Sequence, residues 1–161
     1  MKKVLVICLA LIIGLSMSAQ IQRTFFGFTL GTTTKAEVYN KYHNENLETF
    51  HQSSPNGNCC LNYATFGGYN DWTVVFSFYN DKLYSVRLSH IDPLYKISSS
   101  FNRTLDKKYS KYYIKKESTE YDKVYLDDKT IVELIIGSYV ELSYTDYSLW
   151  RSKINADESD L

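Results

Sequence analysis

Apolar and polar residues alternate most regularly in two neighbouring stretches in the middle of the chain. In residues 72–79 every second side chain from Val74 onward is Val or Phe, and in residues 83–91 the alternation resumes with Tyr, Val and Leu. A period of two is typical of a strand with one buried face. The intervening pair Asn80-Asp81 tolerates left-handed backbone angles, so we predict a β-hairpin here.

Two other segments show the three- and four-residue spacing of amphipathic helices. The first begins with Thr32-Thr33-Thr34 followed by Glu37, which is typical of a helix N-terminus, and it predicts a helix over residues 33–43. The second begins at Pro93, where the missing N–H of proline costs nothing. Its apolar stripe consists of Leu94, Ile97, Phe101, Leu105 and Tyr109.

Shorter stretches complete the predicted set of elements. Two tight turns, Asp127-Asp128-Lys129 and Gly137-Ser138, require the strands that they join to be antiparallel neighbours. A closing helix is expected at residues 147–155. The remaining strands are expected at residues 46–52, 60–66, 112–116, 120–126, 130–136 and 139–145.

The elements repeat in one order, a helix that ends in Lys-Tyr followed by about four antiparallel strands. We therefore predict an α+β fold, an antiparallel sheet with helices packed on one face, built from two helix-then-four-strand units. The units cover about residues 24–92 and 93–146, and a C-terminal helix or tail covers residues 147–161. This pattern indicates an internal duplication, with a loop inserted in the first unit at residues 53–62.

The N-terminus of the chain predicts export. A short basic start precedes an apolar run at residues 4–15 and small residues up to Ala19, which is the layout of a removable signal peptide of residues 1–19. The run is too short for a membrane-spanning helix, which needs about 20 apolar residues. We expect cleavage after Ser18 or Ala19, which leaves residues 20–161 as a single α+β domain, secreted or periplasmic. Without a cysteine at the new N-terminus, no stable membrane anchor is expected.

The charge of the chain is balanced, with 18 Lys and Arg against 18 Asp and Glu. Nucleic acids and anionic membranes attract proteins with a clustered positive field, so neither is expected to be the main partner. The lysines of residues 107–116 lie among acidic residues, which is typical of a solvated helix end.

The cysteines exclude a long-range disulfide framework. Cys59 and Cys60 are adjacent, and the third cysteine, Cys8, belongs to the predicted signal peptide. The favoured interpretation is two thiols that face alternate sides of a strand or loop. An intermolecular bridge and a strained vicinal disulfide are the alternatives.

The sequence contains no G-x-S-x-G, H-E-x-x-H, C-x-x-C or glycine-rich phosphate motif. We therefore expect a protein that is not an enzyme and uses no cofactor or metal. Two alternatives stay open. The cysteines could bind zinc together with His43, His51 or His90. A thiol-dependent hydrolase centred on the Cys59-Cys60 loop could use His51 as its base, if residues 46–52 and 60–66 pair.

The aromatic content indicates a recognition surface. The chain has 15 Tyr, 8 Phe and 2 Trp, and Tyr and Trp combine a large apolar area with a polar group. Their preference for strands is the alternative explanation. The candidate binding residues are Tyr63, Tyr69, Trp72, Tyr125, Tyr139 and Tyr144 on predicted strands or strand ends, with Cys59 and Cys60 in the inserted loop.

Two segments resemble a known group of proteins. Residues 28–38, FTLGTTTKAEV, are similar to the x-x-G-[MT]-[ST]-x-x-[EQ]-V helix opening of small extracytoplasmic modules, and residues 74–83 are similar to their L-x-F-x-x-G-x-L strand pair. This group includes the outer-membrane assembly small lipoproteins and the secreted β-lactamase inhibitor protein. The glycine that usually closes the helix and the lipobox are both absent here.

The resemblance implies a duplicated helix-plus-sheet fold whose members bind other proteins with the open face of the sheet and catalyse nothing. We therefore expect an exported, non-catalytic module that binds a protein partner through its open sheet face and loops. A glycan or a peptide is the less favoured ligand.

Overall fold

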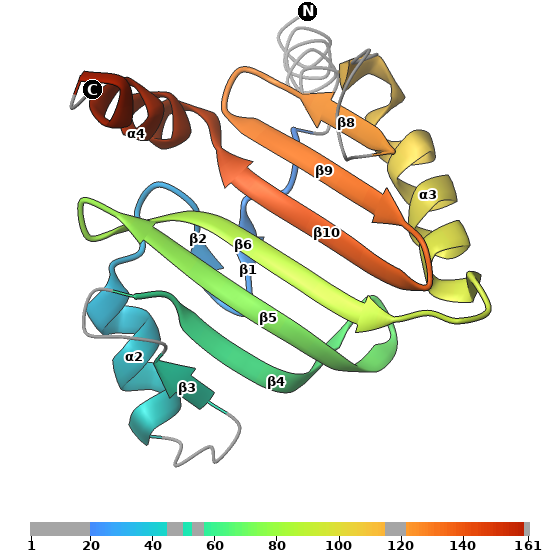
Figure 1. Cartoon of the computed structure of the whole chain (residues 1–161), viewed down its shortest axis with the longest axis horizontal. Helices are drawn as coiled ribbons and strands as arrows, with labels where there is room; N and C mark the ends of the chain where they lie inside the picture. Colours follow the sequence, from blue (N-terminus) through green and yellow to red (C-terminus); the bar gives the residue numbers. More distant parts are fainter. Residues whose placement is uncertain (1–19, 45–49, 53–56, 115–121, 160–161) are drawn as a thin grey trace, which may run out of the picture.

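The computed structural model describes residues 20–44, 50–52, 57–114 and 122–159. The predicted signal peptide lies outside these residues. Within them the chain forms an eight-stranded antiparallel sheet, a two-stranded hairpin and three α-helices (Figure 1). The predicted α+β class is therefore confirmed. None of the helices in these ranges is long and apolar enough to cross a membrane.

The main sheet consists of two antiparallel meanders. The first runs β3-β4-β5-β6, the second runs β7-β8-β9-β10, and they join where β6 pairs with β10. The strand bounds are Phe50–Gln52 (β3), Cys59–Phe66 (β4), Tyr69–Tyr79 (β5), Lys82–Ile91 (β6), Tyr113–Ile114 (β7), Lys123–Leu126 (β8), Thr130–Ile136 (β9) and Tyr139–Asp146 (β10).

A helix precedes each meander. The helix α2 (Lys35–Asn44) precedes β3, and α3 (Lys96–Tyr109), followed by the 3-10 turn η1 (Ser110–Tyr112), precedes β7. The order of elements, a helix and then four strands, is thus the same in both halves. An origin of the halves by duplication stays a prediction.

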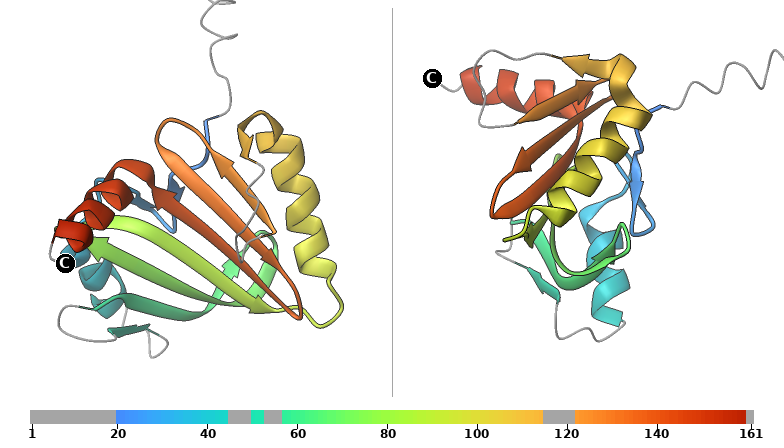
Figure 2. Two further views of the ribbon diagram at one scale, coloured as in Figure 1. Left: turned by 45° about the horizontal axis from the view of Figure 1, so that its top comes forward. Right: turned by 90° about the vertical axis from the view of Figure 1, so that its right-hand side faces the viewer.

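The two sides of the sheet differ in what covers them. The helices α2 and α3 lie on one side, together with the hairpin of β1 (Thr24–Phe25) and β2 (Phe28–Thr29) (Figure 2). The third helix, α4 (Tyr147–Ser159), leaves the end of β10 toward the other side. There Tyr79 of β5 donates its hydroxyl to the carbonyl of Ser152 at 3.4 Å, which ties α4 to one end of that side. We call this second side the open face.

The core fills the space between the sheet and the elements on its covered side. Period-two alternation decides which strand residues enter it, and Val74 and Phe76 are fully buried as predicted for the hairpin. The helix α3 contributes Ile97, Leu105 and Tyr109 from its apolar stripe. The largest fully buried side chains are Trp72, Tyr109, Tyr125, Phe25 and Phe76.

The start of α2 follows the predicted capping pattern. The backbone N–H of Glu37 donates to the hydroxyl of Thr34 at 3.2 Å, and the backbone N–H of Thr34 donates to the carboxylate of Glu37 at 2.7 Å. This reciprocal pair satisfies two N–H groups that would otherwise lack partners at the helix end.

The start of α3 differs from the prediction. The helix begins at Lys96 rather than at Pro93, and its N-cap residue is Tyr95, which has a left-handed backbone and makes no side-chain cap bond. The Asp92 carboxylate accepts the backbone N–H and the hydroxyl of Ser98, each at 2.7 Å. Burial alone raises the pKa of Asp92, but these bonds and the nearby N–H groups of α3 outweigh it, so the pKa is lowered from 3.8.

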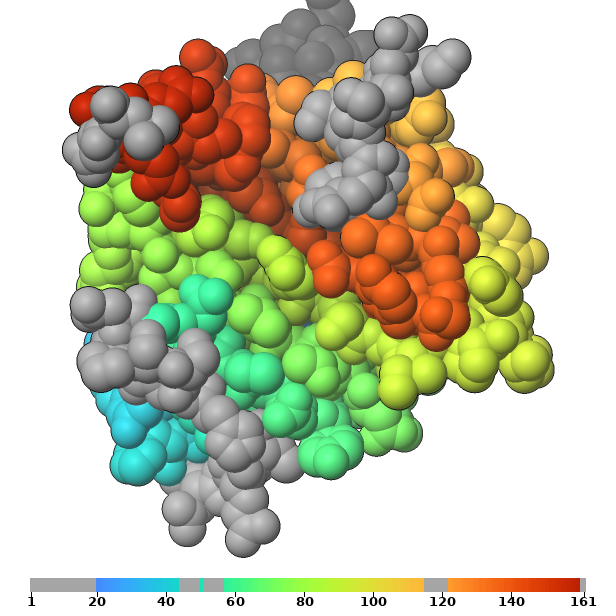
Figure 3. Space-filling view, in the orientation of Figure 1, coloured from blue at the N-terminus to red at the C-terminus, as the bar shows by residue number. Residues whose placement is uncertain are grey.

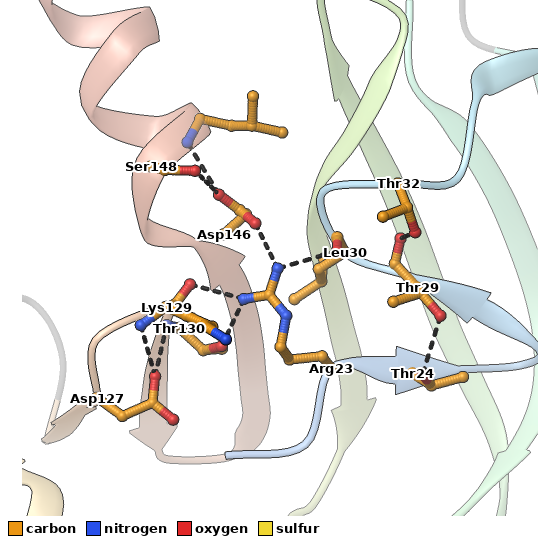
Figure 4. A network of polar contacts seen from close by, with 11 residues as sticks. Arg23, Thr24, Thr29, Leu30, Thr32, Asp127, Lys129, Thr130, Asp146 and Ser148 are labelled. Carbon is orange, nitrogen blue, oxygen red and sulfur yellow. Dashed lines mark hydrogen bonds and ion pairs between the residues drawn. The ribbon is translucent and has the colours of Figure 1, made fainter. Parts of the chain in front are cut away.

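Arg23 connects the N-terminal segment to the second meander (Figure 4). One end nitrogen of its guanidinium, Nη1, donates to the carbonyl of Lys129 at 2.7 Å and to the hydroxyl of Thr130 at 2.9 Å. The other, Nη2, donates to the carbonyl of Leu30 at 2.9 Å and to the carboxylate of Asp146 at 2.5 Å. Both ends of the guanidinium are therefore engaged, and the segment is held against β9 and β10.

Asp146 extends this network into α4. Its carboxylate accepts the hydroxyl of Ser148 at 2.7 Å and the backbone N–H of Leu149 at 2.9 Å. Burial raises the pKa of Asp146, whereas the bonds from Ser148, Leu149 and Arg23 lower it by more, and the net shift is downward. One carboxylate thus caps α4 and binds the N-terminal segment.

We predict that Arg23→Gln lowers the free energy of unfolding by about 2 kcal/mol, because it leaves the largely buried Asp146 carboxylate without its cation. The control is Lys153→Gln, which breaks the exposed pair with Asp157 and should change stability by less than about 0.5 kcal/mol. Urea unfolding followed by circular dichroism measures both. Equal losses in the two variants would contradict the structural role of Arg23.

A second prediction concerns pH. Because the pKa of folded Asp92 lies below its ordinary value of 3.8, its stabilising effect is fully present above that value and is lost as the pH falls through the folded pKa. We expect Asp92→Asn to lower the free energy of unfolding by about 1 kcal/mol at neutral pH, and by progressively less as the pH falls below 3.8. Urea titrations at neutral pH and at a series of acidic pH values, with Asp128→Asn as the exposed control, measure this. If the difference in unfolding free energy between Asp92→Asn and the wild type did not change with pH, the stabilising role of the Asp92 charge would be contradicted.

Candidate functional site

The open face carries a row of polar side chains across its three central strands. The strand register pairs Thr73 of β5 with Ser89 of β6, and Ser89 with Glu141 of β10. Opposite residues in neighbouring strands share a face, so the two hydroxyls and the carboxylate lie side by side.

A second row lies two residues further along each strand. It consists of Asp71, Ile91 and Tyr139, of which Ile91 and Tyr139 are paired directly by the register. Residues two apart in a strand point to the same side, so this row continues the first. The two rows, together with His90, line a shallow hollow of about 500 Å³.

The hollow lies at the free end of the open face. At the other end, where α4 leaves β10, Ser143 and Thr145 are buried. There the hydroxyls of Ser85 and Thr145 are hydrogen-bonded at 3.1 Å. Figure 3 shows this face, with α4 at the upper left and the end of β6 beside the start of β10 toward the lower right. Among the described residues, burial of Ser143 and Thr145 therefore closes the face near α4, and the end with the hollow is the more accessible one.

Large exposed apolar side chains occur mostly at the end of the sheet that carries the hollow. Among the described residues six such side chains are exposed, and five of them lie at this end of the sheet. Ile91 is 76 % exposed and Tyr139 is 48 % exposed, and both line the hollow. We call the five the strand-end cluster: Tyr63, Ile91, Leu94, Tyr95 and Tyr139.

The strand pairing and one turn explain why these side chains lie at the same end of the sheet. A β-bulge in β4 places Asn62 and Tyr63 opposite the single residue Thr73, and Asn62 accepts the hydroxyl of Thr73 at 3.2 Å. Leu94 and Tyr95 belong to the turn that follows Ile91 at the end of β6. The strand-end cluster thus comes from β4, β6, β10 and one turn.

Two tyrosines of the strand-end cluster have strained backbones. Tyr63 has a φ of 58° and Tyr95 a φ of 55°, in the left-handed region that favours glycine. Such a conformation in a bulky residue costs on the order of 1–3 kcal/mol, and it is found most often at functional sites. Asp71 at the edge of the hollow has a φ of 64°, although Asp tolerates this region better.

The hollow contains more carboxylates than cations. Glu141 is paired with Arg87, whose Nε lies 3.5 Å from Oε1 of Glu141, and the Arg87 side chain is mostly exposed. Asp71 is exposed, and no other described residue forms a hydrogen bond or an ion pair with its carboxylate. The Asp71 charge is therefore available to a ligand.

The predicted binding residues divide into two groups. Tyr63 and Tyr139 are exposed in the strand-end cluster, and Tyr69 is half-buried, with its ring 6.3 Å from that of Phe101. Cys60 is half-buried on the open face, where its thiol lies 3.8 Å from the side-chain oxygen of Asn62. These four residues can be reached from solvent to different degrees.

The other four predicted binding residues, Trp72, Tyr125, Tyr144 and Cys59, belong to the core, which corrects the prediction. All are at most 4 % exposed, because their positions in the alternation point toward the helices. Tyr125 donates its hydroxyl to Asp106 at 2.7 Å, and burial, followed by the effect of Asp106, raises the pKa of Tyr125. Tyrosine in this sheet therefore serves the core as well as the surface.

The cysteines are free thiols on opposite faces of β4, as the favoured interpretation predicted. They begin a strand and do not lie in a loop, because β4 starts at Cys59. The register places His51 opposite Cys60, so the pairing on which the hydrolase alternative depends is present. Burial, however, raises the pKa of both thiols, which is the reverse of what a thiolate nucleophile needs.

The histidine rings that the structure describes contact aromatic residues. His43 stacks on Tyr39 at 5.1 Å between ring centroids, and His90 meets Trp72 at 5.2 Å. Within the described part of the chain, no group of three or more His, Cys, Asp or Glu residues is arranged to hold a metal ion.

Ile91, Leu94 and Tyr95 are exposed at this end of the sheet, although no pattern in the sequence predicts them as part of the site. The apolar stripe of the second predicted helix includes Leu94, but α3 begins two residues later and leaves Leu94 exposed in the turn. Ile91 ends β6 on the open face of the sheet. Only the pairing of β6 with β10, which is distant in sequence, brings Ile91 to Tyr139.

The burial of the thiols leads to a third prediction. In a Cys8→Ser background, Cys60 should react with an aromatic disulfide reagent slowly at neutral pH and faster as the pH rises, because burial raises its pKa. Cys59 is fully buried, so the further replacement Cys60→Ser should abolish labelling until denaturant is added. Absorbance of the released thiolate measures the rate. Rapid reaction of Cys60 at neutral pH would instead favour an activated nucleophile.

Comparison with known proteins finds no family model, no curated protein and no solved structure that matches this chain. The resemblance of residues 28–38 and 74–83 to small extracytoplasmic modules therefore stays a prediction. The function has to be argued from the geometry of the open face.

Proposed function

We propose that this protein is an exported, non-catalytic interaction module that binds a protein partner with the free end of its open sheet face. The observation that carries the proposal is that two exposed apolar side chains, Ile91 and Tyr139, line one hollow at the end of the sheet where the strand-end cluster lies. Export follows from the N-terminal pattern of a basic start and an apolar run. The resemblance to extracytoplasmic binding modules supports the same function.

The composition of the surface supports a protein as the partner. Isolated apolar side chains are normal on a protein surface, but a group of them beside polar residues is typical of an interaction site. Tyrosine is enriched among residues that dominate binding energy, and three of the five members of the strand-end cluster are tyrosines. Thr73, Ser89 and Glu141 beside them provide hydrogen-bonding groups of the kind found at the rim of interfaces.

The sheet makes this surface rigid. Tyr139 and Ile91 are held by the ladder between β6 and β10, and Tyr63 by the bulge in β4. Side chains on such a frame lose little backbone freedom on binding, so more of the contact energy appears as affinity. The strained tyrosines are consistent with residues kept for contact rather than for stability.

The alternative function is a thiol-dependent hydrolase at Cys60, and the register that places His51 opposite it is the observation in its favour. The raised pKa of the Cys60 thiol gives this alternative less support than binding has. Replacement of both cysteines by Ser distinguishes the two, because partner binding should persist while a thiol-dependent turnover would be lost.

The proposed function predicts where a partner cross-links. A photoreactive phenylalanine analogue is introduced at Tyr139, and in a separate chain at Tyr113, an exposed tyrosine on β7 outside the strand-end cluster. In the producing cells, position 139 should give a discrete cross-linked product and position 113 should not. Mass spectrometry of the product identifies the partner and the peptide in contact.

The identified partner then allows an affinity measurement. Ile91→Ala and Tyr139→Ala should each weaken binding by roughly tenfold or more in calorimetry, as expected for interface hot spots. Tyr113→Ala should leave the affinity unchanged. The proposal fails if position 139 gives no product, or if the Tyr113 variant loses affinity while the variants of the strand-end cluster keep it.

A further inference from the structure

The hollow combines apolar side chains with carboxylates, and this combination favours one kind of ligand. An apolar strip of Ile91 and Tyr139 lies in it, with the carboxylate of Asp71 at one corner and that of Glu141 at the diagonal corner. These corners are separated by two strand spacings, roughly 10 Å across the sheet. A ligand that fits must therefore combine a long apolar part with a charged end.

The hollow has two carboxylates, and only one of them is in an ion pair. Glu141 is already paired with Arg87, so an incoming cation gains less from it. No described residue is paired with Asp71, and its carboxylate is exposed. The complementary group is consequently a cation that reaches Asp71.

We propose that the hollow receives an arginine side chain of the protein partner, with its stem over Ile91 and its guanidinium at Asp71. This inference rests on the proposed function and specifies the partner's contacting residue. The three methylene groups of arginine pack on apolar surface while the head stays polar, which matches the strip and the corner. The planar guanidinium also binds a carboxylate through two parallel N–H groups.

The neighbouring hydroxyls complete the site. A guanidinium has five N–H groups, and a single carboxylate accepts two of them in the forked geometry. Thr73 and Ser89 line the same hollow and present oxygen atoms that accept others. A lysine has no planar fork and would gain less at this corner, so arginine is the preferred residue.

The test uses two small probes of the same shape that differ in charge and in two N–H donors, which arginine has and citrulline lacks. N-acetyl-arginine methylamide and its neutral isostere N-acetyl-citrulline methylamide are titrated into the isotope-labelled protein at millimolar concentration. Amide resonances of Asp71, Thr73, Ser89 and Glu141 should shift with the arginine probe, and at most a fifth as much with citrulline. Asp71→Asn should remove the difference between the probes, and Asp128→Asn, on an exposed turn, should leave it unchanged.

Three outcomes would overturn the inference. Equal responses to arginine and citrulline would show that charge does not select the ligand, and a difference that persists in Asp71→Asn would place the cation elsewhere. Shifts of the same four residues with maltose, without a response to arginine, would assign the hollow to a neutral glycan. None of these results affects cross-linking from position 139, so a failure here is distinguishable from a failure of the proposed function.

Discussion

The pairing of β6 with β10 is the constraint on which the rest of the structure depends. It is the one ladder that joins the two described meanders, and it aligns Leu88 with Leu142 and Val86 with Tyr144 on the covered side. These side chains are buried, so their position is decided by the loss of apolar surface to water. A slip of one residue would turn every side chain of one strand to the wrong face, which makes this register strongly specified.

The same register builds the open face. When Leu88 meets Leu142 in the core, Ser89 must meet Glu141 and Ile91 must meet Tyr139, because the side chains alternate. The hollow and the core are therefore two sides of one ladder. Burial of apolar side chains on the covered side stabilises the strands that carry the site. The exposed residues therefore contribute little to stability and can serve binding. Strained tyrosines at positions 63 and 95 can persist on such a frame.

One end of the open face is covered by α4 and the other is not, and polar contacts explain the difference. Asp146 caps α4 and binds Arg23, so the helix, the N-terminal segment and the end of β10 form one unit. With α4 held there, Thr145 is buried and one end of the face is closed. At the other end β10 begins after a short turn, and nothing in the described part of the chain covers Tyr139. The open face is thus closed by α4 at one end and accessible to solvent at the other.

By itself the sequence determined the class of fold, the hairpin over residues 72–91, the last two strands and the capping box of α2, because these depend on periods and contacts between near neighbours. It also predicted that Cys59 and Cys60 face opposite ways. Only the tertiary structure decided that Trp72, Tyr125 and Tyr144 are core residues and that Ile91 meets Tyr139. An aromatic residue on a strand has the same local pattern whether it faces the helices or the solvent. The face that it takes depends on pairing with strands far away in the chain, which no local pattern contains.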